Sequence, residues 1–231
     1  ITTFSNYTIV SENRVVKKPK NITMEEAVLF GCAIPTGFGM VMNEIMPKKN
    51  MSVLLIGLGG VGLSSLIALK CLGIKNIVVV DLSSYKLQIA NSFGVSKTLN
   101  VADKNFLNKI NAINPNGFDI CIESAGRTDT IELGFSLINE TCGRLYFASH
   151  PSAKEKISLS PHELIKGKRI YGSWGGKTDP DIDIKKMAEL IKKSKINISS
   201  LIKKNYKLSE INKAISDLES GKIFRPIIKM S

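Results

Sequence analysis

A cluster of glycines forms the pattern with the clearest chemical meaning. Gly57, Gly59 and Gly62 have the G-x-G-x-x-G spacing and follow the apolar run Ser52–Ile56. In such a turn the first glycine permits a tight bend, the second lets the backbone approach a pyrophosphate, and the third lets the next helix pack closely on the strand. The spacing therefore predicts a dinucleotide-binding turn.

An acidic residue follows where this turn requires one. Asp81 ends the apolar run Ile77–Val80, about twenty residues beyond the glycines, where a carboxylate can accept hydrogen bonds from ribose hydroxyls. Its charge would repel a 2′-phosphate, and the stretch Leu82–Tyr85 contains no arginine to bind one. We therefore expect NAD rather than NADP as the cofactor.

The start of the next helix is expected to complete the phosphate site. The first amide groups of a helix lack intrahelical partners and carry the positive end of its dipole. We expect Gly60 and Val61 to donate to the pyrophosphate, with Leu58 inside the turn. The alternative is a glycine turn and a capping aspartate with no ligand.

Apolar periodicity predicts the elements that hold these groups. The run Leu63–Leu72 is apolar nearly all round and is closed by Gly73, which predicts a buried helix. We expect further strands at 118–123, 143–149 and 168–173, and helices at 84–93 and 128–138. This alternation is typical of an α/β fold with a doubly wound parallel sheet. Ser124 follows a strand, so we expect it at the cofactor crevice, because ligands bind at the carboxyl ends of such strands.

The flanking segments have different patterns. Phe4–Val10 and Arg14–Val16 alternate like two short strands, which would need a sheet partner from elsewhere. A capping box at Thr23–Glu26 predicts a helix through Leu29, and Pro35 fits the first turn of a second helix. Near the C-terminus we expect amphipathic helices from Asp183 and over 209–221, and a strand at 224–228.

Composition narrows the class of protein. The 231 residues are 43% hydrophobic, which suits a folded core, and no apolar run approaches the roughly 20 residues of a membrane span. The net charge of +12 comes from scattered lysines without interleaved aromatics, so we expect no nucleic acid or membrane partner and a cytoplasmic location. Cys71, Cys121 and Cys142 lack C-x-x-C spacing and are expected to be reduced core thiols.

Recognisable landmarks lie along nearly the whole chain. They are Thr3–Thr8, Gly31-Cys32 followed by Thr36-Gly37, the glycine turn with Asp81, Glu123–Arg127, Gly172–Gly176, and Ser220-Gly221 with Arg225. Together they resemble the zinc-dependent medium-chain alcohol dehydrogenases, with greatest similarity to the class that includes glutathione-dependent formaldehyde dehydrogenase.

The resemblance implies roles for particular residues. Cys32 matches a ligand of the catalytic zinc, and Thr36 would lie beside the nicotinamide. Lys86 would reach the ribose or a phosphate, and Arg225 would pair with the pyrophosphate. In this family zinc binds the alcohol oxygen and lowers its pKa while hydride passes to the nicotinamide. The alternatives are a buried thiol for Cys32 and a surface arginine for Arg225, and His150 and His162 are expected to be polar loop residues.

The resemblance also implies a domain organisation. Residues 1–33 and 177–231 would be remnants of a GroES-like, β-rich catalytic domain, and residues 34–176 the NAD-binding Rossmann domain. The edge strand 168–173 would pair with its copy in a homodimer. Because the chain opens on Ile1, we expect a fragment. The resemblance implies that the fragment lacks the family's N-terminal half, which carries two of the three catalytic zinc ligands, so we expect that it cannot form the tetrahedral site alone.

The favoured function is that of an oxidoreductase fragment which transfers hydride between NAD and a small alcohol or aldehyde, with zinc in the complete protein. One alternative is a zinc-free quinone or enoyl reductase of the same superfamily, against which Cys32 and Asp81 argue. The other is an NAD-binding module without catalysis.

Overall fold

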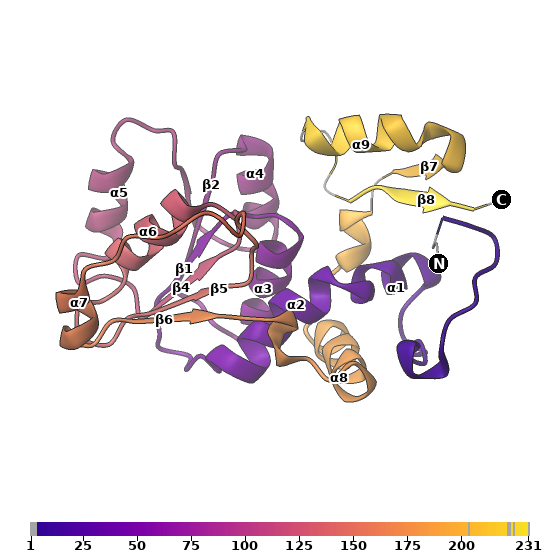
Figure 1. Cartoon of the computed structure of the whole chain (residues 1–231), viewed down its shortest axis with the longest axis horizontal. Coiled ribbons are helices and arrows are strands. Elements are labelled where there is room, and N and C mark those ends of the chain that lie inside the picture. The colour runs from indigo at the N-terminus through magenta and orange to yellow at the C-terminus, as the bar shows by residue number, and fades with distance from the viewer. Residues whose placement is uncertain (1–3, 203, 221–222, 224, 231) are drawn as a thin grey trace. The chain divides into compact units, whose positions relative to one another are not determined.

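The computed structural model describes residues 4–202, 204–220, 223 and 225–230 (Figure 1). Two compact units make up the chain: Cys32–Thr178, and Ile1–Gly31 together with Asp179–Ser231. We call them the sheet unit and the outer unit. Their boundaries lie within two residues of those expected from the sequence. The assignment of the outer unit to a GroES-like domain stays a prediction.

The sheet unit contains a six-stranded parallel sheet in the order β3-β2-β1-β4-β5-β6. This is the doubly wound order, in which the strand sequence reverses between β1 and β4 and leaves a crevice at the carboxyl ends. The predicted Rossmann fold is confirmed. Its strands are β1 (Val53–Ile56), β2 (Ile77–Asp81), β3 (Lys97–Asn100), β4 (Ile120–Glu123), β5 (Arg144–Phe147) and β6 (Arg169–Gly172).

Helices cover both faces of this sheet. The predicted helices after β1, β2 and β4 are present, and Gly73 and Gly94 follow two of them with φ angles of +75° and +76°. The helices are α2 (Ala33–Gly39), continued by the π-helical turn η3 (Met40–Ile45), then α3 (Gly60–Cys71), α4 (Ser84–Ser92), α5 (Phe106–Ile113), α6 (Thr128–Leu137) and α7 (Pro161–Lys166), with the short 3₁₀ turn η4 (Gly175–Lys177).

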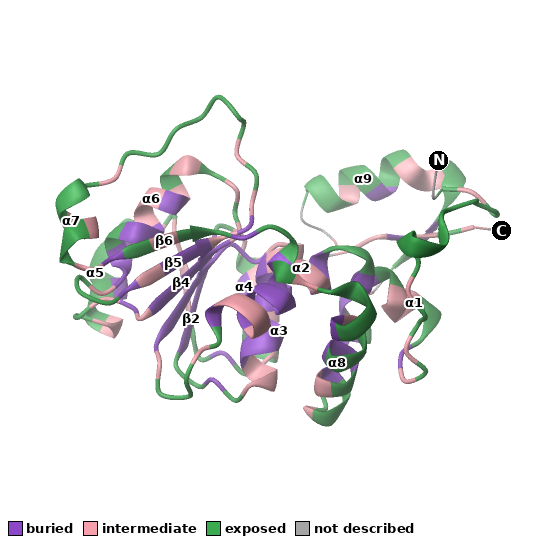
Figure 2. Ribbon diagram, turned by 60° about the horizontal axis from the view of Figure 1, so that its bottom comes forward, coloured by how far each residue is buried: buried purple, intermediate pink, exposed green. Residues whose placement is uncertain are grey.

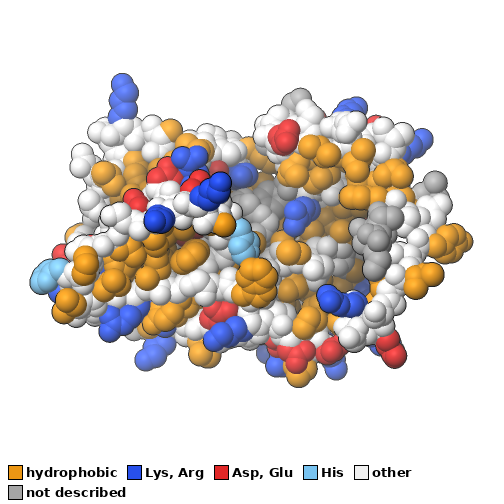
Figure 3. All heavy atoms as spheres, viewed as in Figure 1, with side chains coloured by type: hydrophobic (Ala, Val, Ile, Leu, Met, Phe, Trp, Pro, Cys, Tyr) orange, Lys and Arg blue, Asp and Glu red, His pale blue; other side chains and the backbone are white. Residues whose placement is uncertain are grey.

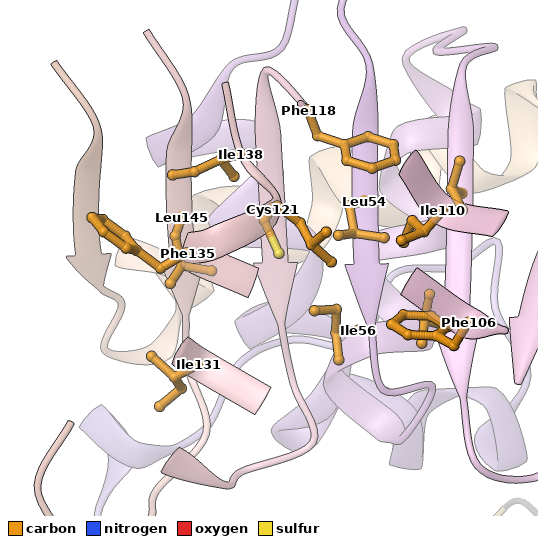
Figure 4. Close-up of a cluster of buried hydrophobic side chains, with 13 residues drawn as sticks. Leu54, Ile56, Phe106, Ile110, Phe118, Cys121, Ile131, Phe135, Ile138 and Leu145 are labelled. Atoms are coloured by element: carbon orange, nitrogen blue, oxygen red, sulfur yellow. The ribbon is translucent and has the colours of Figure 1, made fainter. Parts of the chain in front are cut away.

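A continuous core lies between the sheet and helices α5 and α6 (Figure 4). Leu54 and Ile56 of β1 face this side because alternate residues of a strand point the same way, and Phe106, Ile110 and Phe135 meet them from the helices. Every residue of β1, β2 and β4 is buried (Figure 2). Burial on both faces is typical of parallel sheets and explains the continuous apolar runs in the sequence.

The outer unit is built from short elements. Thr23 and Glu26 form the predicted capping box, in which the Glu26 N–H donates to Thr23 Oγ1 at 3.1 Å and the Thr23 N–H donates to Glu26 Oε2 at 2.8 Å. The elements are η1 (Glu12–Arg14), α1 (Met24–Ala27), η2 (Val28–Gly31), α8 (Pro180–Lys193), η5 (Ile198–Leu201), β7 (Asn205–Lys207), η6 (Leu208–Glu210), α9 (Ile211–Glu219) and β8 (Ile227–Lys229), and β7 pairs with β8 in parallel.

The two strands predicted near the N-terminus are wrong. Residues 4–16 contain no strand, and Glu12–Arg14 forms a 3₁₀ turn. Tyr7 and Ile9 are 93% and 92% exposed, so the alternation buries no face. A strand needs a neighbour for its backbone groups, and alternation in the sequence does not supply one. The C-terminal strand begins at Ile227 rather than 224. Three predicted features, at Thr3, Gly221 and Phe224, lie outside the described residues.

The three cysteines expected in the core differ from one another. Cys121 is fully buried, and burial raises the pKa of its thiol well above the usual range. Cys71 is half-buried, whereas Cys142 is exposed and its Sγ lies 3.2 Å from Asn139 Oδ1. The prediction of a core thiol is therefore wrong for Cys142, because its glycine turn lies at the surface.

In the described part of the chain, no single helix is long and apolar enough to cross a membrane. The segments Met24–Gly31 and Ala33–Ile45 satisfy length and composition only when joined across a bend. Phe38, Met40 and Val41 in the second segment are fully buried within the protein.

Candidate dinucleotide site

The three glycines of the turn occupy three different environments. Gly57 has φ +85°, a conformation that favours glycine, and a Cβ there would lie 2.7 Å from the Ala125 amide nitrogen. At Gly62 a Cβ would lie 2.1 Å from the Gly57 carbonyl oxygen. At Gly59 it would meet no protein atom within 4 Å. The first and third glycines are therefore required by the fold, whereas the space at the second is open to a ligand.

Helix α3 begins at this open position. Gly59 is its N-cap residue and has no side chain to satisfy the first amide groups, and Gly60 and Val61 are half-buried. Uncapped N–H groups and the helix dipole together make an anion site. The turn and the start of α3 thus have the geometry that a pyrophosphate requires.

Asp81 ends β2 and is 8% exposed. Its Oδ2 accepts the Leu58 N–H at 2.7 Å, and its Oδ1 accepts the Ser83 N–H at 2.8 Å. Lys86 Nζ lies 3.9 Å from Oδ2. Because a carboxylate oxygen has two lone pairs, each can still accept a ribose hydroxyl. Asp81 therefore fixes the glycine turn, a contact that the spacing in the sequence did not reveal. Contact between Asp81 and a ribose stays a prediction.

Ser124 connects the end of β4 to the same turn. Its Oγ donates to the Gly57 carbonyl at 2.7 Å and lies 3.3 Å from the Ile56 carbonyl oxygen. Its hydroxyl therefore helps to hold the turn in place. Direct contact between Ser124 and a cofactor stays a prediction.

Glu123 is the functional candidate that the sequence analysis missed. It is the last residue of β4 and is 0% exposed. Its Oε1 accepts from the amides of Ala125 and Gly126 and from Thr130 Oγ1 at 2.8–2.9 Å, and its Oε2 accepts from Ser149 Oγ at 2.6 Å. An acid ending an apolar run before Ser-Ala-Gly was the available signal. Three of these partners lie within 7 residues of Glu123 in the sequence, and the fourth, Ser149, is 26 residues away and is brought to it by the fold.

Cys32 and Thr36 lie at the start of α2. Cys32 is the N-cap residue and its thiol is exposed, which is contrary to the alternative of a buried thiol. Helix α2 packs between α3 and η4: a Cβ at Gly37 would lie 2.2 Å from the Val61 carbonyl oxygen, and one at Gly176 would lie 2.4 Å from that of Thr36. Thr36 is therefore held beside the start of α3 and the turn that follows β6.

The residues of this chain do not themselves fit a catalytic zinc, which needs three protein donors. Among the described residues no group of three or more His, Cys, Asp or Glu side chains is placed to hold a metal ion. His150 packs edge-on against Trp174 with ring centroids 5.2 Å apart, and His162 lies on α7. Arg225 is half-buried in the outer unit, and its contact with the pyrophosphate stays a prediction.

Residues 60–193, more than half of the chain, match the sequence model of a family described as zinc-binding dehydrogenase. The chain belongs to this family. It is 29% identical over 230 residues to alcohol dehydrogenase 1 of Pisum sativum and to alcohol dehydrogenase class-2 isozyme 2 of Oryctolagus cuniculus. These alignments cover 99% of the chain but 60% of each relative, so the chain spans about three fifths of their length.

Solved structures are similar over the same extent. Benzyl alcohol dehydrogenase from Acinetobacter calcoaceticus has a TM-score of 0.87 and 28% identity, with 94% of this chain and 59% of that protein covered. An alcohol dehydrogenase zinc-binding domain protein from Burkholderia ambifaria has a TM-score of 0.86 and 27% identity, with 94% and 58% covered. Both units of the zinc-binding dehydrogenase chain thus fall within the region that resembles these proteins.

Proposed function

We propose that this chain is the NAD-binding part, with flanking segments, of a dehydrogenase that transfers hydride between NAD and a small alcohol or aldehyde. The observation that carries the proposal is the glycine turn, which is open at Gly59 and fixed to the buried carboxylate of Asp81. The family and the alcohol dehydrogenases that the chain resembles support the same reaction class.

The described groups suggest how the cofactor lies. Its pyrophosphate would accept from the amides of Gly60 and Val61, and its adenosine ribose would donate to Asp81. Lys86 is near enough to Asp81 to contact the ribose or a phosphate. The nicotinamide half would extend over β4 towards Ser124 and Thr36, because each half of such a sheet binds one nucleotide.

A catalytic zinc would bind only in a longer protein. Cys32 is exposed at the start of α2 and can supply one thiolate, so the remaining donors would come from the part of the relatives that this chain does not span. The single donor also favours a second candidate function, an NAD-binding module without catalysis. A cytoplasmic location stays a prediction.

We also propose a homodimer that joins two copies of β6. This strand lies at the edge of the sheet, and its residues are exposed or half-buried. Hydrophobic side chains gather on the left half of Figure 3, where Figure 1 places β6. An exposed edge of this kind offers unpaired backbone groups to a second strand.

Metal content and NADH production test the proposed reaction. The 231-residue chain should bind NAD but retain no tightly bound zinc and oxidise no alcohol. A longer chain that includes the part spanned by the relatives should gain both properties, and Cys32→Ser in it should remove both while NAD binding changes by about threefold at most. Bound zinc or turnover in the 231-residue chain would contradict this proposal.

A further inference from the structure

A buried carboxylate lies beneath the half of the crevice that the proposed function leaves for the nicotinamide. Glu123 ends β4, its partners Ala125 and Gly126 follow directly, and Ser149 follows β5. Because Asp81 on β2 belongs to the adenosine half of the sheet, the nicotinamide nucleotide would lie over the carboxyl ends of β4 and β5. Glu123 therefore lies on the nicotinamide side.

Hydrogen-bond donors surround the Glu123 carboxylate. Its four partners are two backbone amides and the hydroxyls of Thr130 and Ser149, all of which can donate. These are neutral groups, so they stabilise the negative charge without cancelling it. Because the side chain is 0% exposed, dissolved ions screen this charge far less than a surface charge.

We propose that the negative charge of Glu123 makes the site favour the oxidised cofactor over the reduced one. The inference rests on the proposed NAD site. The nicotinamide ring is positively charged when oxidised and neutral when reduced, so a fixed negative charge beneath it stabilises NAD⁺ and leaves NADH nearly unaffected. We expect this preference to be on the order of tenfold, or about 1.4 kcal/mol, which is the size of effect that a single charge has at an effective dielectric constant of about 20.

Glu123→Gln is the informative variant, because it keeps the shape of the side chain. The amide oxygen can accept from Ala125 and Gly126, and the amide nitrogen can donate to Ser149 Oγ. Titration calorimetry with NAD⁺, NADH and ADP-ribose, which lacks nicotinamide, separates charge from structure. We expect the affinity for NAD⁺ relative to NADH to fall about tenfold, and ADP-ribose affinity to change by about twofold at most.

A second variant covers the case in which Glu123→Gln does not fold. Thr130 is half-buried and its hydroxyl donates a hydrogen bond to the Glu123 carboxylate. Thr130→Lys should therefore bring an ammonium group to this carboxylate and lower the affinity for NAD⁺ relative to NADH. Asp129→Asn is the control, because this neighbouring acid is 62% exposed and paired with Arg127. Asp129→Asn should change the ratio of NAD⁺ to NADH affinity only slightly, and this change should vanish at high salt. The change caused by Glu123→Gln should persist at high salt.

The results of these titrations distinguish a failure of the Glu123 inference from a failure of the proposed NAD site. If the variants leave the ratio of NAD⁺ to NADH affinity unchanged, or weaken NAD⁺, NADH and ADP-ribose equally, Glu123 has only a structural role and the inference is wrong. If none of the three ligands binds the unmodified chain, the proposed NAD site is wrong and this inference with it.

Discussion

Within the glycine turn, some glycines are required by the fold and Gly59 leaves space for a ligand. Gly59 has φ −80°, which any residue can adopt, and a Cβ there faces open space. We therefore expect Gly59→Ala to fold like the unmodified chain but to bind NADH about tenfold more weakly or worse, because its methyl group occupies the approach of the pyrophosphate. Thermal unfolding and cofactor titration measure the two effects.

Two other glycines are matched controls for this prediction. Gly62→Ala places its methyl group 2.1 Å from the Gly57 carbonyl oxygen and should destabilise the fold by about 1–3 kcal/mol. Gly31→Ala meets no atom within 4 Å and lies in the outer unit, so it should change neither property. Unimpaired NADH binding by Gly59→Ala would show that the open space is not the pyrophosphate site.

Asp81→Ser should affect folding as well as cofactor choice. Removal of the carboxylate leaves the Leu58 N–H without its acceptor, at a cost of about 1–3 kcal/mol, because Leu58 is fully buried. We expect the affinity of Asp81→Ser for NADH to fall but to stay above its affinity for NADPH, so the preference for NADH narrows without reversing. Chemical denaturation and both titrations test this, and a variant of unchanged stability would contradict it.

Residue patterns predicted the turn and Asp81 because their roles depend on local spacing and backbone conformation. Gly57 needs a positive φ and Asp81 ends the next strand, and both facts can be recognised in the sequence. Glu123 escaped prediction in part because its partner Ser149, which is 26 residues away in the sequence, is brought to it only by the fold. Cys142 was misplaced because a short apolar sequence does not reveal which turns lie at the surface.

At the scale of elements, the backbone of β6 allows a clean test of the proposed dimer. The Arg169 and Ser173 N–H groups donate to carbonyls of the β5 segment, so alternation points the Ile170 N–H towards the open edge. Ile170→Pro should therefore break the dimer and leave the sheet intact. Light scattering at tens of micromolar should give a dimer for the original chain and a monomer for the variant.

Tyr171→Pro is the control at the neighbouring position. The Tyr171 N–H points towards β5, so this change should destabilise the sheet itself. A monomeric original chain, or an Ile170→Pro variant that remains dimeric, would exclude pairing through β6.

Strands buried on both faces were predicted well, whereas of the two edge strands β6 was predicted and β3 was not. The strands β1, β2 and β4 appear as continuous apolar runs because helices cover both sides of them. Strand β3 is mostly polar and lies at an edge, so no apolar run marks it in the sequence. The N-terminal alternation failed as a prediction for the opposite reason, because strand pairing depends on a neighbour that the local sequence does not specify.

On the scale of the whole molecule, most residues of the proposed cofactor site lie in one of the two units. The sheet unit holds the glycine turn, Asp81, Glu123 and the start of α2. The chain spans about three fifths of the relatives' length, so cofactor binding can be tested on it directly, whereas the proposed alcohol oxidation would also need the part that the chain does not span. The charge of +12 should speed capture of an anionic dinucleotide, an effect that salt reduces.

Titration of the 231-residue chain with NADH and with NADPH, followed by cofactor fluorescence, tests the central claim most directly. The Asp81 carboxylate can accept the two hydroxyls of an adenosine ribose and repels a 2′-phosphate at the same position. We therefore predict saturable binding of NADH, with NADPH weaker by about tenfold or more. Equal affinity, tighter binding of NADPH, or no saturable binding of NADH would contradict the assignment of this crevice as an NAD site.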